Sequence, residues 1–265
     1  KLTSLNMTGS HIGSNGIMAL LQALQHPDCK LESLDIGMTC LSDETAKVLA
    51  ESLEHPNCKL TSLNLDHTYI YGEQVKRLAE ALQHPNSKLR SLCLFAAIEN
   101  DLKGVEELAS ALQHPNCKLI SLDLRFNNVD NERAKVLAGA LQHPNCKLTS
   151  LNLTGNYINY EGAKALAGAL KNSNCKLSSL SLGNNPMRGY DVEELAEALK
   201  HPNCKLASLV LSGNPIDSKG LEVFLKSLQH PNCKLTSLDL SNNEIDCERL
   251  QLLAGALQHR SEEHT

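Results

Sequence analysis

Leucine residues recur along this chain with a period of about 29 residues. Each repeat unit begins with the pattern LxxLxLxxNxI, which is represented in unit six by Leu148, Leu151, Leu153, Asn156 and Ile158. The alternation of leucines predicts a short strand with these side chains turned inward. Apolar residues then recur at helical spacing, as over residues 134–141, and they predict a helix with one apolar stripe. Each unit is therefore expected to be a strand followed by a helix.

The boundaries of the predicted helices carry their own signals. Asp130, Asn159, Asp191 and Asp246 stand where helix N-caps are expected. Most units end in a histidine followed by a proline, and proline cannot continue a helix because it lacks the backbone N–H. Consensus Asn residues occupy units five to nine as Asn127, Asn156, Asn185, Asn214 and Asn243. Units one to four lack this Asn, which predicts looser turn packing there because an Asn side chain satisfies backbone groups of neighbouring turns.

The repeat covers the whole chain of 265 residues. Units start near residues 1, 30, 59, 88, 118, 147, 176, 205 and 234, and unit four contains a single-residue insertion within residues 96–101. A local bulge is expected at that insertion. We predict a single domain over residues 1–265 made of nine units. Because helices are wider than strands, stacked units form a curved α/β solenoid, a right-handed arc with parallel strands on the concave face and helices on the convex face.

The pattern LxxLxLxxNxI at this period, with a full helix and an Asn-Cys-Lys junction, resembles the leucine-rich repeats of ribonuclease-inhibitor type. The junction at residues 143–148, His-Pro-Asn-Cys-Lys-Leu, is similar to junctions in the repeat regions of NOD-like receptors. Arrays of this type also occur in bacterial leucine-rich-repeat effectors. The resemblance covers essentially the whole chain and implies a protein-interaction module within a larger sensor or effector protein.

The net charge limits the class of partner, and the positions of the cysteines indicate their redox state. The net charge of −5 and a pI near 6.1 argue against general binding to nucleic acid or to an anionic membrane. Seven of the ten cysteines recur at one position of the repeat, which favours packed, reduced thiols over a disulfide framework. We expect a cytoplasmic protein, in the host cytosol if it is a secreted bacterial effector, that is a monomer in isolation. The chain begins with Lys1, so we expect the true N-terminus to lie upstream.

Catalytic and metal-binding motifs are absent from the sequence: it has no phosphate-binding glycine loop, no HExxH and no GxSxG. His-x-x-Cys pairs recur with the repeat, but no second His or Cys cluster completes a metal site. A lysine also precedes each predicted strand, and we interpret this ladder as solubilising charge at the edge of the sheet. The chain is therefore predicted to have no enzyme activity, cofactor or metal.

The predicted strand face offers the candidate binding residues. Each strand contains one Ser at the same position, which indicates a structural role, whereas neighbouring positions vary from unit to unit. Such variation on a repeated scaffold is typical of partner specificity. In units two to five these positions and the adjacent loops carry charged and aromatic residues, which units six to nine mostly replace with Thr, Gly, Ser and Asn. The predicted partner-binding residues are Asp35, Asp66, His67, Tyr69, Tyr71, Arg90, Phe95, Asp123, Arg125, Phe126 and Tyr157.

Three functions remain open on these grounds. The first is recognition of a protein partner, whose identity the sequence does not give, through this surface, since Tyr and Arg are frequent in interface hot spots. The second is regulation of a small GTPase, because Ran GTPase-activating protein is built from similar repeats. The third is inhibition of a ribonuclease, although the predicted strand face is neither rich in Trp nor strongly acidic.

Overall fold

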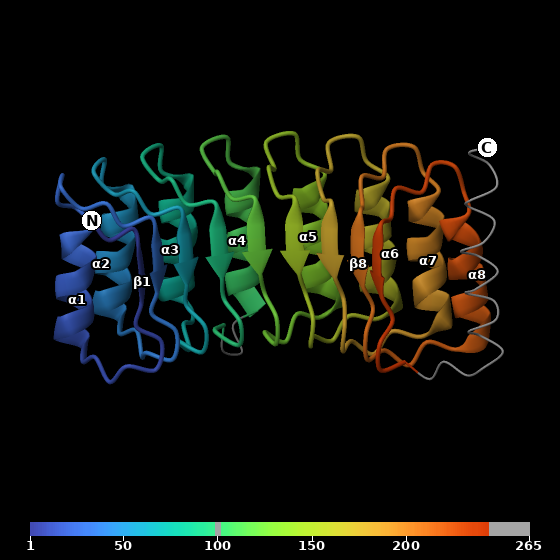
Figure 1. The fold of residues 1–265 in the computed structure, drawn as a ribbon, viewed down its shortest axis with the longest axis horizontal. Helices are drawn as coiled ribbons and strands as arrows, with labels where there is room; N and C mark the ends of the chain where they lie inside the picture. The colour runs from blue at the N-terminus through green and yellow to red at the C-terminus, as the bar shows by residue number, and fades with distance from the viewer. Residues whose placement is uncertain (99–101, 244–265) are drawn as a thin grey trace. The chain divides into compact units, whose positions relative to one another are not determined.

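The computed structural model describes residues 1–98 and 102–243. These residues contain nine strands that alternate with eight helices (Figure 1). They form two compact parts. The first part comprises Lys1–Asn127 and Pro144–Leu151, and the second comprises Asn128–His143 and the residues from Asn152 onward.

The first part contains five complete strands, each of three residues: β1 (Ser4–Asn6), β2 (Ser33–Asp35), β3 (Ser62–Asn64), β4 (Ser91–Cys93) and β5 (Ser121–Asp123). Neighbouring strands pair in parallel, in sequence order, with Ser opposite Ser and Leu opposite Leu. Its helices are α1 (Ser14–Ala23), α2 (Asp43–Glu54), α3 (Glu73–Gln83) and α4 (Leu102–Gln113). This register confirms the strand predicted from the alternating leucines, because each inward leucine stacks on the equivalent leucine of the next unit.

The second part repeats the same plan. Its helices are α5 (Asn131–Leu141), α6 (Tyr160–Leu170), α7 (Gly189–Leu199) and α8 (Ser218–Leu228). Its strands are β7 (Ser179–Ser181), β8 (Ser208–Val210) and β9 (Ser237–Asp239), which pair in parallel. Strand β6 (Ser150–Asn152) is divided between the two parts along the sequence. The repeat therefore specifies one local structure throughout the described residues.

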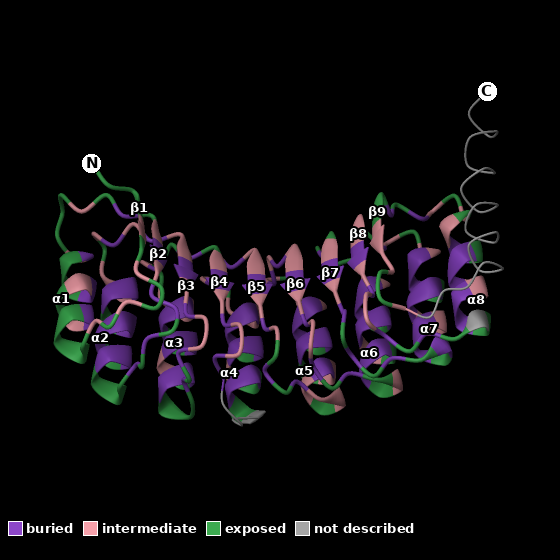
Figure 2. Ribbon diagram, turned by 60° about the horizontal axis from the view of Figure 1, so that its bottom comes forward, coloured by how far each residue is buried: buried purple, intermediate pink, exposed green. Residues whose placement is uncertain are grey.

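The core of each part lies between its strands and its helices. In each part the helices cover one face of the strands and turn their buried sides toward it (Figure 2). We call the opposite face the strand face. Leu63, Leu92 and Leu122 of adjacent strands are almost fully buried, as are Leu78 and Leu82 of α3. Full burial of one such side chain stabilises the fold by about 1.5–3 kcal/mol, so these aliphatic layers form most of the core, to which α8 adds the buried ring of Phe224.

The junction that follows each helix joins one unit to the unit before it. After α2, the Nδ1 atom of His55 accepts the N–H of Asn57 at 3.2 Å, and the Asn57 amide donates to the carbonyl of Gln25 at 3.0 Å. The ammonium of Lys59 donates to the carbonyl of Cys29 at 2.8 Å. Cys58 packs inside with 3% of its surface exposed. The His, Asn, Cys and Lys of the junction thus each have a structural role.

Hydrogen bonding at the consensus Asn position differs between a later unit and an early unit. Asn127 accepts the N–H groups of Ala97 and Ile98 at 2.9 and 2.8 Å and donates to the carbonyl of Leu94 at 2.7 Å, all in the preceding unit. At the equivalent position the hydroxyl of Thr68 donates to Leu65 of its own unit at 2.7 Å. Looser packing in the early units stays a prediction, and part of the predicted bulge at residues 96–101 lies outside the described residues.

The helix caps predicted from the sequence are confirmed in part, and the predicted cap at Asp246 lies outside the described residues. Asp130 is the N-cap of α5, and its side chain accepts the N–H of Arg133 at 2.9 Å. Asn159 precedes α6 but makes no side-chain capping bond. Asp191 is not an N-cap: α7 begins earlier, after Arg188, and the Asp191 carboxylate reaches back to accept the Arg188 N–H at 2.7 Å. The prediction was wrong there because a carboxylate can satisfy a helix start from within the first turn.

Two further properties concern the described residues alone. Within residues 1–98 and 102–243, no helix has both the length and the apolar character needed to cross a lipid bilayer. The nine cysteines at described positions are free thiols.

Candidate functional site

One backbone position is left-handed in every unit. It is the fifth residue after the first Ser of each of the nine described strands, with φ between 46° and 70°. Its occupants are Gly9, Met38, His67, Ala96, Phe126, Gly155, Asn184, Gly213 and Asn242. Glycine and asparagine adopt this conformation readily, whereas other residues pay a steric penalty of about 1–2 kcal/mol. Units two to five therefore hold their residues there at a cost in stability that the other units avoid.

The side chains at the strained positions project from the C-terminal ends of their strands. Met38, which follows β2, is 60% exposed, and Phe126, which follows β5, is 50% exposed. His67 follows β3 and is partly buried. Strain of this kind, when it recurs at adjacent positions, is a feature of ligand-binding sites. It marks the ends of β2 to β5 as different from the rest of the repeat.

Aromatic rings from three consecutive units form a continuous contact chain at this edge. His67 meets Phe95 with ring centroids 4.6 Å apart, and Phe95 meets Phe126 at 5.4 Å. Tyr69 extends the chain, because its ring lies 6.4 Å from that of His67. We call Tyr69, His67, Phe95 and Phe126 the aromatic row. Tyr69 and Phe126 at its two ends are exposed, so the row presents aromatic surface to solvent at both ends.

Arg125 is fixed beside the aromatic row. Its guanidinium lies 4.9 Å from the ring centroid of Phe95, a cation–π distance. The same group donates from Nε to both carboxylate oxygens of Asp123, at 2.8 and 3.0 Å. The Asp123 carboxylate raises the pKa of Arg125 above its ordinary value. Arg125 is thus held in one position by its neighbours.

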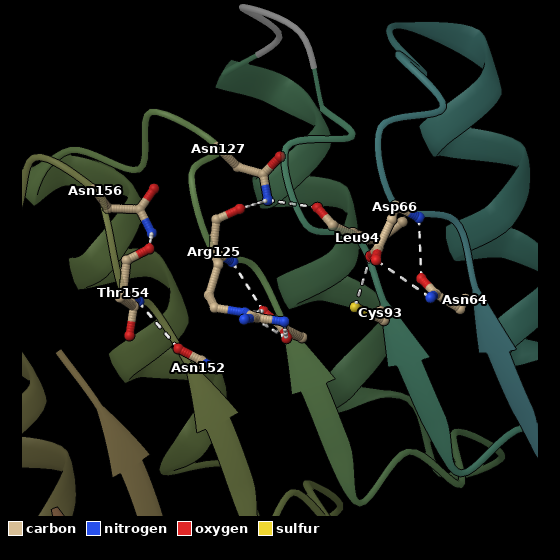
Figure 3. Close-up of polar contacts among 10 residues, drawn as sticks. Asn64, Asp66, Cys93, Leu94, Arg125, Asn127, Asn152, Thr154 and Asn156 are labelled. Carbon is tan, nitrogen blue, oxygen red and sulfur yellow. Dashed lines mark hydrogen bonds and ion pairs between the residues drawn. The ribbon is translucent and has the colours of Figure 1, made fainter. Parts of the chain in front are cut away.

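Asp66 is held by its neighbours in a similar way. Its backbone N–H donates to the Asn64 side-chain oxygen at 3.0 Å, and the Cys93 thiol donates to its carboxylate at 3.0 Å (Figure 3). Burial, followed by the hydrogen bond to Asp66, raises the pKa of the Cys93 thiol to about 12. The thiol therefore stays protonated at neutral pH. In β2, the carboxylate of Asp35 accepts the N–H of Gly37 at 3.0 Å, so part of its hydrogen-bonding capacity is used in its own turn.

The structure separates the predicted binding residues into groups. His67, Tyr69, Phe95, Asp123, Arg125 and Phe126 come together at the C-terminal ends of β3 to β5. Tyr71 is exposed in the loop before α3, beyond the row. Arg90 lies at the other end of β4, immediately before Ser91. Tyr157 is exposed in the second part of the chain and is not a member of the row.

A separate hollow lies where Arg90 is found. It has a volume of about 360 Å³ and is lined by Thr61, Lys88, Arg90, Lys118, Ile120 and Lys147. We call it the basic pocket. Sequence reasoning placed Arg90 on the same surface as the aromatic residues and assigned the lysines to solubility. It missed this pocket because the repeat alone does not show which side chains converge.

The left-handed conformation at Ala96 and Met38 was also missed. Its signal was present in the sequence, since Gly and Asn occupy the same column in five other units. Reading that column as a backbone requirement would have revealed the strain. Among the described residues, no group of three or more His, Cys, Asp or Glu side chains is arranged to hold a metal ion.

Comparison with known proteins supports the architecture. A family model described as Leucine Rich repeat matches residues 1–21, 116–138, 145–167, 203–225 and 232–248. The fold is an α/β leucine-rich-repeat fold. Domains with this fold generally act as protein-interaction modules, and the family is usually non-catalytic. A search of the curated proteins finds no match to the chain.

Two solved structures match the chain at low sequence identity. Actin-binding site 2 of leiomodin-1 matches with 17% identity and a TM-score of 0.42, over 70% of this chain and 88% of that one. An internalin from Listeria monocytogenes matches with 19% identity and a TM-score of 0.38, over 96% of this chain and 85% of that one. No conclusion about the partner or role of this chain follows from either match.

Proposed function

We propose that this leucine-rich-repeat domain recognises a protein partner through the aromatic row and Arg125. The observation that carries the proposal is the left-handed backbone under Met38, His67, Ala96 and Phe126. The remaining five units use Gly or Asn at this position, and three of these four strained units use it to display a large side chain. A structural role would be served better by Gly, so recognition is the reason that fits these residues.

The composition of the surface suits a protein partner. Tyr and Arg are among the residues that contribute most to binding at protein interfaces. Phe95 and Phe126 already contact each other, and Arg125 is already bonded to Asp123, so little side-chain entropy is lost on binding. We expect the partner to place an apolar side chain against the two phenylalanines. Asp66, His67, Tyr69 and Tyr71 would then form the surrounding polar rim.

The test is capture of a partner from cytosolic extract by the protein and by its R125A/F126A variant. The matched control is T154A/S212A, because Thr154 and Ser212 occupy the Arg125 position in units six and eight. We expect a partner, identified by mass spectrometry, that binds the parent and the control but not R125A/F126A. Thermal unfolding of all three proteins checks that each is folded. Equal capture by R125A/F126A would overturn the proposal.

A second variant, F126N, distinguishes loss of the binding surface from loss of the folded structure. F126N removes the ring but supplies Asn, the residue that units seven and nine use at this left-handed position. The backbone strain is relieved, so the variant should stay folded while losing its ring contact with Phe95 and with the partner. Full binding by F126N would place the contact elsewhere.

The proposal also covers the kind of protein to which this domain belongs. We place the domain, as a single unit over residues 1–265, in a larger cytoplasmic sensor or effector protein, with repeats of ribonuclease-inhibitor type and no activity of its own. The full helix in each of the eight described strand–helix units supports that type. Regulation of a small GTPase and inhibition of a ribonuclease are the alternatives. Acceleration of GTP hydrolysis by a candidate small GTPase, or inhibition of a ribonuclease, would replace the proposal.

A further inference from the structure

The basic pocket brings four cations together at the N-terminal ends of β4 and β5. Lys88 and Arg90 come from the segment before β4, Lys118 from the segment before β5, and Lys147 from the next unit. Thr61 and Ile120 complete the lining. No acidic side chain lines the hollow, although the whole chain has a net charge of −5. The local charge is thus opposite to that of the molecule.

The lysines of the pocket are held in place by backbone carbonyl groups. Lys118 donates to Ser87 at 2.7 Å and to Pro85 at 3.0 Å, and Lys147 donates to Cys117 and to Pro115, each at 2.9 Å. An ammonium group has three N–H donors. Each lysine therefore uses two donors to fix its position and presents the third. Carbonyl oxygens orient the ammonium but leave its positive charge uncompensated.

The four cations form no ion pair with any residue that the structure describes. An anion bound between them would therefore compensate unpaired positive charge and gain several charge-assisted hydrogen bonds.

Arg90 makes the pocket specific to unit four. The equivalent residue before the first Ser of each other strand is not basic: these residues are Thr3, Glu32, Thr61, Ile120, Thr149, Ser178, Ala207 and Thr236. An arginine presents a planar fork of donors that matches phosphate and carboxylate oxygens. Arg90 is exposed, so this fork is accessible from solvent. The lysine ladder is common to all units, and Arg90 converts one stretch of it into a site.

The donor set favours a phosphate group over a single carboxylate. A phosphorylated side chain has about −1.5 to −2 charges and three strong acceptor oxygens. These match the Arg90 fork together with one N–H from each of two adjacent lysines. Lysines in successive units are spaced by roughly the 4.7–4.9 Å separation of strands, so the row is longer than one phosphate. The pocket volume of about 360 Å³ also accommodates a neighbouring acidic side chain.

The pocket and the aromatic row lie at opposite ends of the same strand. Arg90 and Phe95 flank β4 (Ser91–Cys93) and are five residues apart, or about 16 Å at the rise of an extended chain. We propose that the basic pocket binds a phosphorylated side chain on an extended segment of the protein partner, which places an apolar side chain about five residues away against the aromatic row. This inference rests on the proposed function, and it adds the chemical class of the partner segment.

The experiment uses a degenerate peptide library with a fixed phosphoserine, and the same library with serine, both passed over the immobilised protein. The test variants are R90T, which installs the residue found in units three and six, and K118A. The matched control is K205A, because Lys205 makes the same two carbonyl bonds at Cys175 and Ser173. K118A and K205A therefore lose the same structural contacts, and only K118A alters the pocket.

We expect the immobilised parent protein and the K205A variant to retain about tenfold more phosphopeptide than serine peptide. R90T and K118A should lose this preference, and recovered peptides should be enriched in an apolar residue about five positions from the phosphoserine. No phosphate preference, or an unchanged preference in R90T, would overturn the inference. Tighter binding of inorganic tripolyphosphate than of any recovered peptide, or R90T-sensitive binding of single-stranded RNA alone, would also overturn it.

The two proposals fail separately. If capture of the partner from extract depends on Arg125 and Phe126 but no peptide binds in a phosphate-dependent way, only the phosphate inference is lost. If capture is unchanged in R125A/F126A, the proposed function is lost, whatever the peptide library shows.

Discussion

The ring of Phe126 meets the ring of Phe95 edge-on, with centroids 5.4 Å apart and ring planes at 65°. The two residues come from adjacent repeat units, and Phe126 has a left-handed backbone with φ 55°. Phe95 in turn lies under the guanidinium of Arg125. A strained backbone and a favourable ring contact are thus present in the same residue, and their energies oppose each other.

This contact predicts energetic coupling between the two phenylalanines. Edge-to-face aromatic pairs contribute about 0.5–1.5 kcal/mol beyond their burial, and the half-exposed position of Phe126 favours the lower end. A double-mutant cycle with F95A, F126A and the double variant measures it by chemical denaturation. The Tyr160–Tyr190 pair, with centroids 5.7 Å apart in the second part, is the control, and its loss should not affect partner capture. Additive effects of F95A and F126A would contradict the prediction.

The left-handed positions predict that some substitutions stabilise the protein. M38N and A96N place Asn where Asn184 and Asn242 already stand in other units. Relief of the steric penalty should raise the free energy of unfolding by about 1 kcal/mol for each variant. Urea denaturation provides the measurement. The reverse change, N184A, should lower stability by a similar amount. Destabilisation by A96N would show that the strain assigned to this position is absent.

Much of the fold could be predicted from the sequence because the repeat fixes it locally. The alternating leucines predict β3 and β4, and the structure pairs Leu63 with Leu92 in the expected register. The same repeat reasoning located the N-cap at Asp130. It placed a cap wrongly at Asp191, since a carboxylate in the first turn and one at the N-cap can both satisfy the helix start.

The sequence predicted which residues belong to the site better than it predicted how these residues are arranged. Phe95, Arg125 and Phe126 were identified because they depart from the repeat, and the structure brings them together. Arg90 departs from the repeat equally but lies at the opposite end of β4. Sequence variation shows which positions depart from the repeat. It does not show which side chains lie next to them, because that depends on three-dimensional contacts such as the hydrogen bond from Lys118 to the Ser87 carbonyl.

The consensus Asn residues predict a large loss of stability on substitution. Asn185 is buried, donates to the carbonyls of Leu153 and Leu182 at 3.0 and 3.1 Å, and accepts the N–H of Ile158 at 3.0 Å. N185A leaves these buried groups unsatisfied, so we expect a loss of about 3 kcal/mol. Chemical denaturation measures it. The comparison variant T68V removes one hydrogen bond within a unit and should cost about 1 kcal/mol. Equal losses of stability in N185A and T68V would show that hydrogen bonds between units contribute no extra stability.

The thiol of Cys93 predicts a specific pH dependence. Burial and the Asp66 hydrogen bond raise its pKa from 9.0 to about 12 in the folded protein. The unfolded chain releases this proton above pH 9.0, whereas the folded chain retains it. The contribution of the neutral thiol to stability is therefore fully present below pH 9 and is lost as the pH rises toward 12. The free energy of unfolding of C93A should fall less steeply over this range than that of the parent.

The same pKa predicts how Cys93 reacts, because the thiolate is the nucleophile. At about pH 8, iodoacetamide should modify the exposed Cys40 first and the partly buried Cys93 much more slowly. Peptide mass spectrometry of the alkylated protein gives the order. D66N removes the second cause of the raised pKa and should quicken alkylation of Cys93, while burial, the larger cause, still keeps it slower than Cys40. Alkylation of Cys93 as fast as that of Cys40 in the folded parent would contradict the raised pKa of the Cys93 thiol.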